Sequence, residues 1–265
     1  MSFIWQQLLY RPLLNILIFL YNTIAFKNMG VAIIELTVAI RLILISPSLK
    51  ALRAQIALQK LQPEIDKIRK KYKDDKQKQN KATMEFYQKN KINPLSSCLP
   101  TLIQLPILIA LFWIFRDALN SNNMHLLYPF VQNPGQVNTY FLGMNLSNKG
   151  NWILAILAAV SQFWQSKMIM PKMQPGAQGM QSMLTNQMIY FMPLITLVFA
   201  LQFPAGLALY WVTTTVFAVA TQWFVLKDSK KENFGEEANK SKSEGRITKF
   251  LKKYSEVQKN GRKGK

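Results

Sequence analysis

The sequence has one cysteine, Cys98, and one histidine, His125. A single thiol cannot close a disulfide within the chain, and neither residue has neighbours with which to build a multi-ligand metal site. The motifs G-x-x-x-x-G-K-[ST], H-E-x-x-H and G-x-S-x-G are all missing. The sequence therefore predicts no catalytic residue, no metal site and no cofactor, which argues against an enzyme.

Acidic residues are also few, since 13 Asp and Glu accompany 33 Lys and Arg and give a formal net charge of +20. Such an excess can indicate nucleic-acid binding, but these basic residues are unevenly distributed. They concentrate in residues 50–91, at Lys167 and Lys172, and from Lys227 onward, whereas the other connecting segments carry only Arg11, Lys27, Arg116 and Lys149. This asymmetry is typical of a membrane protein whose basic segments face the cytoplasm.

Five apolar runs are long enough to cross about 30 Å of hydrocarbon. They predict an all-α membrane protein with transmembrane helices at residues 29–46, 99–118, 151–168, 187–203 and 205–226. With five spans the three basic segments share one side, so the positive-inside rule predicts an outer N-terminus and a cytoplasmic C-terminus. The predicted parts are an N-terminal segment (1–27), a core (28–226) and a basic tail (227–265).

The N-terminal segment is apolar at residues 13–21 apart from Asn15, and its polar residues Gln7, Arg11, Asn15 and Asn22 recur at helical spacing. One polar stripe on an apolar helix favours an amphipathic helix that lies in the interface on the outer face of the membrane over a helix that crosses the bilayer. A signal peptide is the alternative, but a basic start and a small-residue cleavage site are not evident.

Residues 48–92 form a polar insertion between the first two predicted spans. Apolar residues of its first half recur near helical spacing, at Leu49, Leu52, Ile56, Leu61, Ile65, Ile68 and Tyr72. After a break at residues 73–76, a second helical stretch continues to Asn93 and Pro94. The pattern predicts a cytoplasmic antiparallel helical hairpin, with a kink or restart of its first arm at Pro63.

Arg41 lies inside the apolar run 31–45, where a permanent charge needs an explanation. An arginine at the centre of a membrane helix costs roughly 2.5–3.5 kcal/mol unless a polar cavity, a partner or the headgroups receive it. If Pro47 ends the helix, about 9 Å of helix separates Arg41 from that end, and the side chain can snorkel across much of this distance. From these residues alone, the cavity and the headgroups are equally good explanations.

Several motifs follow Arg41 in a fixed order. They are N-P-L at 93–95, C-L-P-T-L-I-Q-L-P at 98–106, F-M-P at 191–193 and F-P-A-G-L-A-L-Y-W at 203–211. In this order they resemble the YidC-type membrane protein insertases of the Oxa/Alb/YidC superfamily, over nearly all of residues 1–226. The sequence departs from many relatives in having no large extracytoplasmic domain and no N-terminal lipobox cysteine.

The resemblance implies five helices around a hydrophilic groove that is open to the cytoplasm and to lipid and closed on the outside. Arg41 matches the family's groove arginine, Gln104 the polar residue of its Q-x-P span, and Tyr210 and Trp211 the aromatic positions near the substrate-contacting helix. Two further glutamines could hydrate the same cavity or cap their helices, and these are Gln165 and Gln187. Glu35 is assigned no role.

The implied function is that of a bacterial plasma-membrane insertase, which lowers the barrier to crossing for nascent membrane proteins without nucleotide hydrolysis. The expected partners are those nascent chains and membrane lipid, with the ribosome, bound through the basic tail, and the Sec translocon as further candidates. A single copy is expected to suffice. Recruitment of substrate is assigned to four residues of the hairpin: Lys67, Arg69, Lys70 and Lys71.

A small-solute transporter or channel is the main alternative, because an intramembrane arginine with several glutamines could also bind a solute. A transporter of this kind predicts an inverted repeat, which inspection of the sequence does not find. A scaffold that merely binds anionic lipid through its tail is a third alternative.

Overall fold

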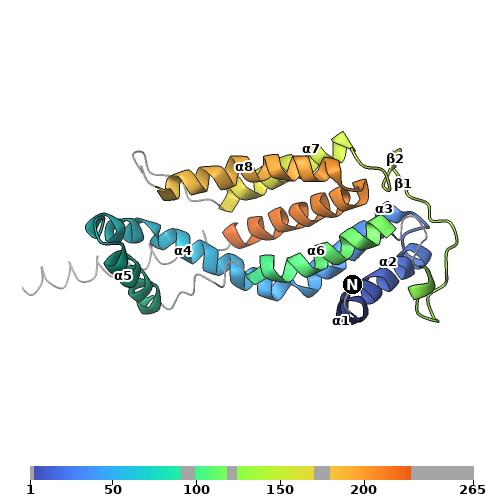
Figure 1. The fold of residues 1–265 in the computed structure, drawn as a ribbon, viewed down its shortest axis with the longest axis horizontal. Coiled ribbons are helices and arrows are strands. Elements are labelled where there is room, and N and C mark those ends of the chain that lie inside the picture. Colours follow the sequence, from blue (N-terminus) through green and yellow to red (C-terminus); the bar gives the residue numbers. More distant parts are fainter. Residues whose placement is uncertain (1–2, 91–98, 118–123, 170–179, 228–265) are drawn as a thin grey trace, which may run out of the picture. The chain divides into compact units, whose positions relative to one another are not determined.

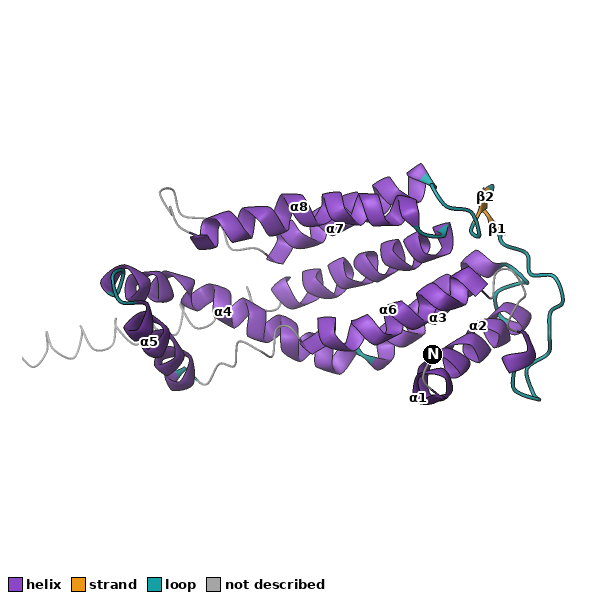
Figure 2. Ribbon diagram, in the orientation of Figure 1, coloured by secondary structure: helices purple, strands orange, loops and turns teal. Residues whose placement is uncertain are grey.

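The computed structural model describes residues 3–90, 99–117, 124–169 and 180–227. This part of the chain is nearly all helical, with one short two-stranded sheet (Figures 1 and 2). By its contacts the chain divides into Met1–Gln222 and Trp223–Lys265. Of the second unit only the helical end at 223–227 is described, where Lys227 Nζ lies 5.0 Å from the centre of the Trp223 ring.

The N-terminal segment forms one continuous helical stretch of α1 (Phe3–Trp5), a π-helical turn (Gln6–Tyr10) and α2 (Arg11–Thr23). The π turn precedes Pro12, whose ring would clash with the carbonyl four residues earlier in a regular α-helix. The predicted polar stripe bonds to the chain itself: Asn15 Nδ2 donates to Leu126 O and Asn22 Nδ2 to Gln132 O. The helix also contributes buried residues to the core, at Leu14, Leu17, Ile18 and Tyr21.

The first predicted span is the helix α3 (Met29–Ile43), which begins at Asn28, whose side chain accepts hydrogen bonds from the N–H groups of Gly30 and Val31. The chain bends by 66° at Leu44 into α4 (Ile45–Lys71). The expectation that Pro47 ends the first helix is therefore wrong. Pro47 lies in the first turn of α4, where its missing N–H costs no helical hydrogen bond, and the break precedes it.

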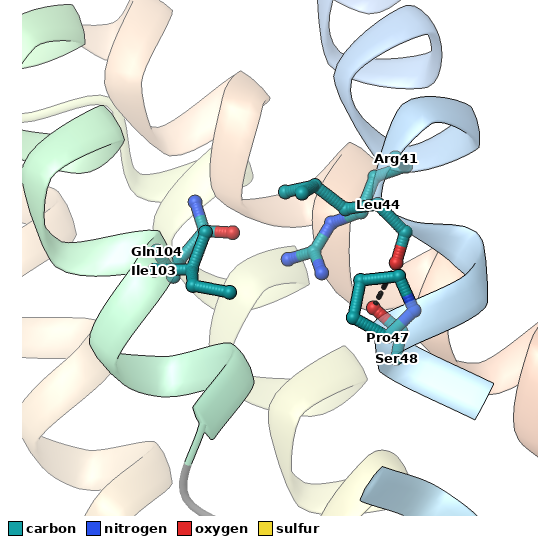
Figure 3. A pocket seen from close by; sticks show the side chains of 6 residues that line it. All are labelled: Arg41, Leu44, Pro47, Ser48, Ile103 and Gln104. Atoms are coloured by element: carbon teal, nitrogen blue, oxygen red, sulfur yellow. Dashed lines mark hydrogen bonds between the residues drawn. The ribbon is translucent and has the colours of Figure 1, made fainter. Parts of the chain in front are cut away.

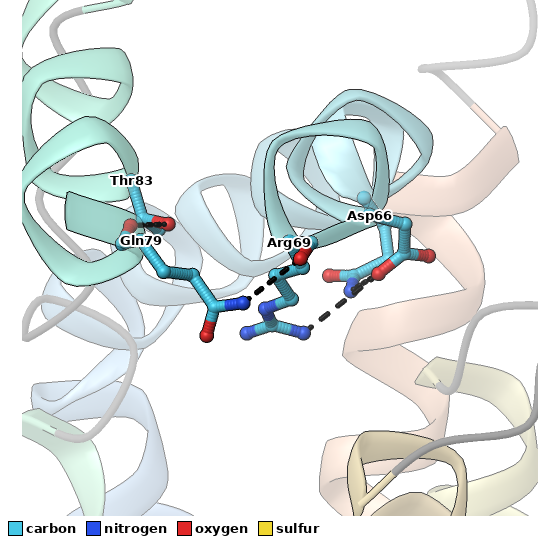
Figure 4. A network of polar contacts seen from close by, with 5 residues as sticks. Asp66, Arg69, Gln79 and Thr83 are labelled. Atoms are coloured by element: carbon cyan, nitrogen blue, oxygen red, sulfur yellow. Dashed lines mark hydrogen bonds and ion pairs between the residues drawn. The ribbon is translucent and has the colours of Figure 1, made fainter. Parts of the chain in front are cut away.

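The helical hairpin consists of α4 and α5 (Lys76–Lys89), which contact each other as the apolar stripe predicts. Ile65 of that stripe is 1% exposed. A hydrogen bond from Gln79 Nε2 to Arg69 O, 2.9 Å long, links the two arms (Figure 4). The helix α4 continues past Pro63, so the proline does not restart it.

The other predicted spans correspond to α6 (Leu99–Asp117), α7 (Trp152–Ile169), α8 (Met180–Gln202) and an unlabelled C-terminal helix (Ala205–Lys227). The helix α8 begins at Met180, earlier than the predicted 187, because a helix can extend beyond its apolar stretch. In the described ranges only the C-terminal helix is by itself long and apolar enough to cross a membrane, and the bent pair α3–α4 can count as a second.

The segment between α6 and α7 (residues 124–151) is hydrogen-bonded to the starts of two helices, α3 and the C-terminal helix. Its strands β1 (Tyr140–Phe141) and β2 (Met144–Asn145) form an antiparallel hairpin. Met29 N donates to Asn138 O, which joins the segment to the start of α3. Ala205 N and Gly206 N donate to carbonyls of residues 148 and 146, which joins it to the start of the C-terminal helix.

Candidate functional site

Arg41 lies in the last turn of α3, where the helix dipole favours a positive charge. It lines a pocket of about 230 Å³, its open mouth included, together with Leu44, Pro47, Ser48, Ile103 and Gln104. Figure 3 shows Arg41 and Gln104 extending into this space from the different helices that carry them. The 66° bend therefore forms one wall of the pocket, because Leu44 and the first turn of α4 line it directly.

The guanidinium is incompletely paired within the described part of the chain. Its Nε is buried and has no hydrogen-bond partner there. A buried donor that lacks an acceptor costs free energy, and more so when it belongs to a charged group. Arg41 therefore offers a binding site to an anionic or carbonyl group that enters the pocket. The nearby Glu35 is not among the pocket residues, and its Oε2 is likewise buried and unpaired.

Gln104 connects this pocket to the C-terminal helix. Its Nε2 donates a hydrogen bond to the hydroxyl of Tyr210, a side chain that is 3% exposed. The structure thus brings three of the sequence-predicted residues together from three different helices, α3, α6 and the C-terminal helix.

Trp211 takes part in a separate polar contact, between α7 and the C-terminal helix. Its Nε1 lies 3.4 Å from Gln162 Oε1, and the hydroxyls of Ser161 and Thr215 are 2.7 Å apart. Gln165 is partly buried on the same helix but does not line the Arg41 pocket. Gln187 lies on α8 in a stretch whose side chains are outside the described residues.

Sequence reasoning missed Ser161, Gln162 and Thr215. The sequence did contain a signal for them, because polar side chains in apolar helices are expected to bond to a neighbouring helix. However, Gln162 and Gln165 are three positions apart and lie on nearly the same side of α7, so either could meet the C-terminal helix. That choice depends on the rotation of α7 against the C-terminal helix, which the sequence pattern does not specify.

The four basic residues predicted to recruit substrate lie at the end of α4. Lys67, Lys70 and Lys71 are exposed, whereas Arg69 is partly buried and its guanidinium lies 3.7 Å from Asp66 (Figure 4). The three lysines thus present positive charge on the hairpin surface. Arg69 instead has two contacts within the hairpin, because its carbonyl also accepts the bond from Gln79.

A model described as "60Kd inner membrane protein" matches residues 19–233, which is most of the chain. The chain belongs to this family. Within the family it is 34% identical over 221 residues to a membrane protein insertase YidC of Fusobacterium nucleatum, covering 83% of this chain and 97% of that one.

A longer relative in the 60Kd inner membrane protein family is the membrane protein insertase YidC of Hahella chejuensis. It is 32% identical over 239 residues, which are 90% of this chain but only 38% of the relative. The structure also matches a crystal structure of an active YidC insertase, with a TM-score of 0.59 and 26% identity, over 84% of this chain and 47% of that one. The resemblance inferred from the ordered motifs is thereby confirmed.

Proposed function

We propose that this chain is a membrane protein insertase, which inserts nascent membrane proteins by lowering a physical barrier and not by bond chemistry. Two insertases of the family support this proposal, one of them over nearly its whole length. The observation that carries it is the pocket in which Arg41 has an unpaired buried Nε beside Gln104. Such a pocket can hold a polar group that would otherwise have to enter hydrocarbon unpaired.

We further propose that α3, α6, α7, α8 and the C-terminal helix all cross the membrane. The exposure of α7 supports this arrangement. Apart from Lys167 in its last turn, its exposed residues are apolar and recur at helical spacing, at Trp152, Ile153, Ile156, Leu157, Val160 and Trp164, while Leu154, Ala155 and Ala158 are buried. A helix with its bulky apolar residues outside and alanines inside is suited to lipid, because small residues let neighbouring helices approach closely.

In this proposal the pocket is part of a hydrophilic groove open to the cytoplasm and to lipid. The main barrier to insertion is the desolvation of charged and polar groups in the translocated segment. A groove that reaches part of the way through the bilayer shortens the apolar distance such a segment must cross. Arg41 attracts acidic residues of that segment, and the substrate's hydrophobic helix leaves along Tyr210 and Trp211.

The remaining parts of the chain are assigned to recruitment and attachment. The exposed lysines of the hairpin receive substrate on the cytoplasmic side of a bacterial plasma membrane, and the N-terminal helix lies at the outer interface. The basic tail, which falls outside the described residues, binds ribosomes or anionic lipid. The Sec translocon is a further partner, and one copy of the chain is sufficient.

The test is reconstitution of the purified chain into lipid vesicles with one nascent single-span substrate. We expect protease protection of the substrate's translocated tail in these vesicles and little protection in empty ones. Equal protection in both would contradict the proposal. Uptake of small solutes without any gain in substrate insertion would favour a transporter or channel, and neither activity would favour a scaffold.

A further inference from the structure

Two bulky apolar residues, Phe26 and Leu142, occupy backbone conformations that such residues rarely adopt. Their φ angles are +52° and +50°, in the left-handed region. Leu142 and Gly143 form the two-residue turn between the paired residues Phe141 and Met144, and both have positive φ. This turn strongly favours asparagine, aspartate or glycine at its first position, so leucine there is strained.

Neither side chain gains burial within the described chain that would offset this strain. Phe26 is 92% exposed and Leu142 is 81% exposed. Strained residues persist where the surroundings over-determine them, and they gather at functional positions. Here the apolar side chains are both strained and exposed, which favours a contact for them beyond the described residues.

The two residues belong to segments that lie side by side. Asn28, two residues after Phe26, donates from Nδ2 to Tyr140 O over 3.1 Å, and Met29 N donates to Asn138 O. Phe141 packs directly over Gly30 at the start of α3. Figure 1 shows the β1–β2 hairpin beside this end of α3. We call Phe26 and Leu142 the tip pair.

We propose that the tip pair inserts into the lipid interface on the side of the membrane where α3 begins. The inference rests on the membrane placement in the proposed function. Lipid is the favoured occupant because the segment that leads to Phe26 exposes further apolar side chains, Phe19 on α2 and Ile24 just after it. The exposed Lys27, next to Phe26, can meet lipid phosphates while the apolar side chains lie below them.

The experiment measures the depth of spin labels in the full chain, reconstituted in vesicles of phosphatidylcholine with phosphatidylglycerol. Single cysteines replace Phe26 or Leu142 in a Cys98→Ser background. Relaxation by oxygen, which concentrates in hydrocarbon, is compared with relaxation by a water-soluble nickel chelate. Gln136→Cys, an exposed polar site on the α6–α7 segment, is the aqueous control, and Ile156→Cys on α7 is the control for membrane embedding.

We expect the oxygen-to-nickel ratio at both tip positions to exceed that at Gln136 several-fold. If the ratio at the tip positions equals that at Gln136 while the Ile156 label lies in hydrocarbon, insertion of the tip pair is overturned and the membrane placement is not. An Ile156 label in water would overturn the membrane placement, and with it the insertion of the tip pair. Tip labels shielded from both reagents would overturn lipid as the occupant and indicate contact with another protein copy.

A second comparison avoids labelling the tip itself. A spin label at Tyr140, which is 60% exposed, reports on the hairpin while Leu142 is varied. Leu142→Asn fits the left-handed turn better but removes the apolar group, so we expect the label to become more accessible to nickel. Leu142→Met keeps the apolar group and should leave the label unchanged. An unchanged label in Leu142→Asn would also overturn the proposal.

Discussion

The side chain of Gln104 donates a hydrogen bond to the hydroxyl of Tyr210, which lies 106 positions later in the sequence. The bond joins α6 to the C-terminal helix beside Arg41, the one charged residue among the described residues that line the pocket. Between membrane helices such a bond contributes about 0.5–2 kcal/mol. It therefore both stabilises the helix pair and orients a polar group toward the pocket.

The first prediction tests this bond by a double-mutant cycle. Tyr210→Phe removes the hydroxyl and Gln104→Leu removes the amide, so the double variant should be more stable than the sum of the single effects predicts. We expect a coupling of about 0.5–2 kcal/mol in the free energy of unfolding in detergent. Additive effects would mean that the two groups do not interact in the folded protein.

The second prediction concerns the charge of Arg41. Arg41→Ala should impair insertion of substrates with acidic tails, and Arg41→Lys should retain more activity because it keeps the charge. The attraction at 4 Å is worth up to about 4 kcal/mol at an effective dielectric near 20, so a loss of about tenfold or more is expected. Substrates with neutral tails are the control, and equal losses for both kinds of tail would contradict an electrostatic role.

A third prediction concerns the side on which the proposed groove opens. In a Cys98→Ser background, Gln104→Cys should react with a membrane-impermeant thiol reagent added from the cytoplasmic side and not from the outside. Lys71→Cys and Lys149→Cys, both at exposed positions, mark the cytoplasmic and outer sides in the proposed topology. Reaction of the cysteine at 104 from both sides would instead support a pore or a transporter with alternating access.

The fourth prediction concerns the contact between α3 and the β1–β2 hairpin. A Cβ added at Gly30 would lie 2.2 Å from Phe141 Cγ, closer than any real contact. Gly30→Ala should therefore displace Phe141 and destabilise the protein by about 1–3 kcal/mol, as overpacking does. In a Phe141→Gly background, which also removes the Phe141 Cβ that would lie 2.6 Å away, the same substitution should cost much less. Equal costs in the two backgrounds, from thermal unfolding, would place the effect elsewhere.

The fifth prediction concerns the start of α5, where Asp75 accepts a hydrogen bond from Lys78 N over 3.0 Å. This backbone N–H, together with the Lys78 side chain, lowers the pKa of the Asp75 carboxyl below its ordinary value. The cap should therefore stabilise α5 fully above the ordinary pKa of about 3.9, and the stabilisation should be lost as pH falls through the lowered folded pKa.

Hydrogen exchange of the hairpin amides in the intact protein measures this effect. Asp75→Ala should speed exchange near Lys78 at neutral pH, whereas Asp75→Asn, which caps without a charge, should preserve protection and remove the pH dependence. The same pH dependence in Asp75→Asn as in the original chain would assign the titration to another group.

Features with a local pattern could be predicted from the sequence, and the hairpin is the clearest case. Its apolar residues recur with the period of a helix, the structure buries Ile65 among them, and the two arms contact each other. Arg41 stood out because its apolar surroundings make a charge costly. The position of the break was missed because Pro47 is compatible with the first turn of a helix as well as with an ending.

Features that depend on distant partners could not be predicted. The stripe that includes Arg11 and Asn15 predicts an amphipathic helix, but nothing local indicates that both side chains bond to Leu126 O. The same holds for Gln104 and Tyr210, whose pairing depends on how two helices approach. The resemblance to a known family predicted that Arg41, Gln104 and Tyr210 belong to one site. The residues alone indicated only which polar groups stand out in apolar segments.

The bonds from the N-terminal helix to residue 126 also affect the order in which this protein can assemble. Arg11 Nε donates to Leu126 O across 115 positions. At about 5–20 residues per second, a ribosome needs roughly 6–23 s to make the intervening chain. During that time Arg11 and Asn15 have no carbonyl of Leu126 to bond, so their side chains must bond to water or to another polar group. A protein proposed to help others enter the membrane thus has an early segment of its own that cannot complete its hydrogen bonds until nearly half the chain has been synthesised.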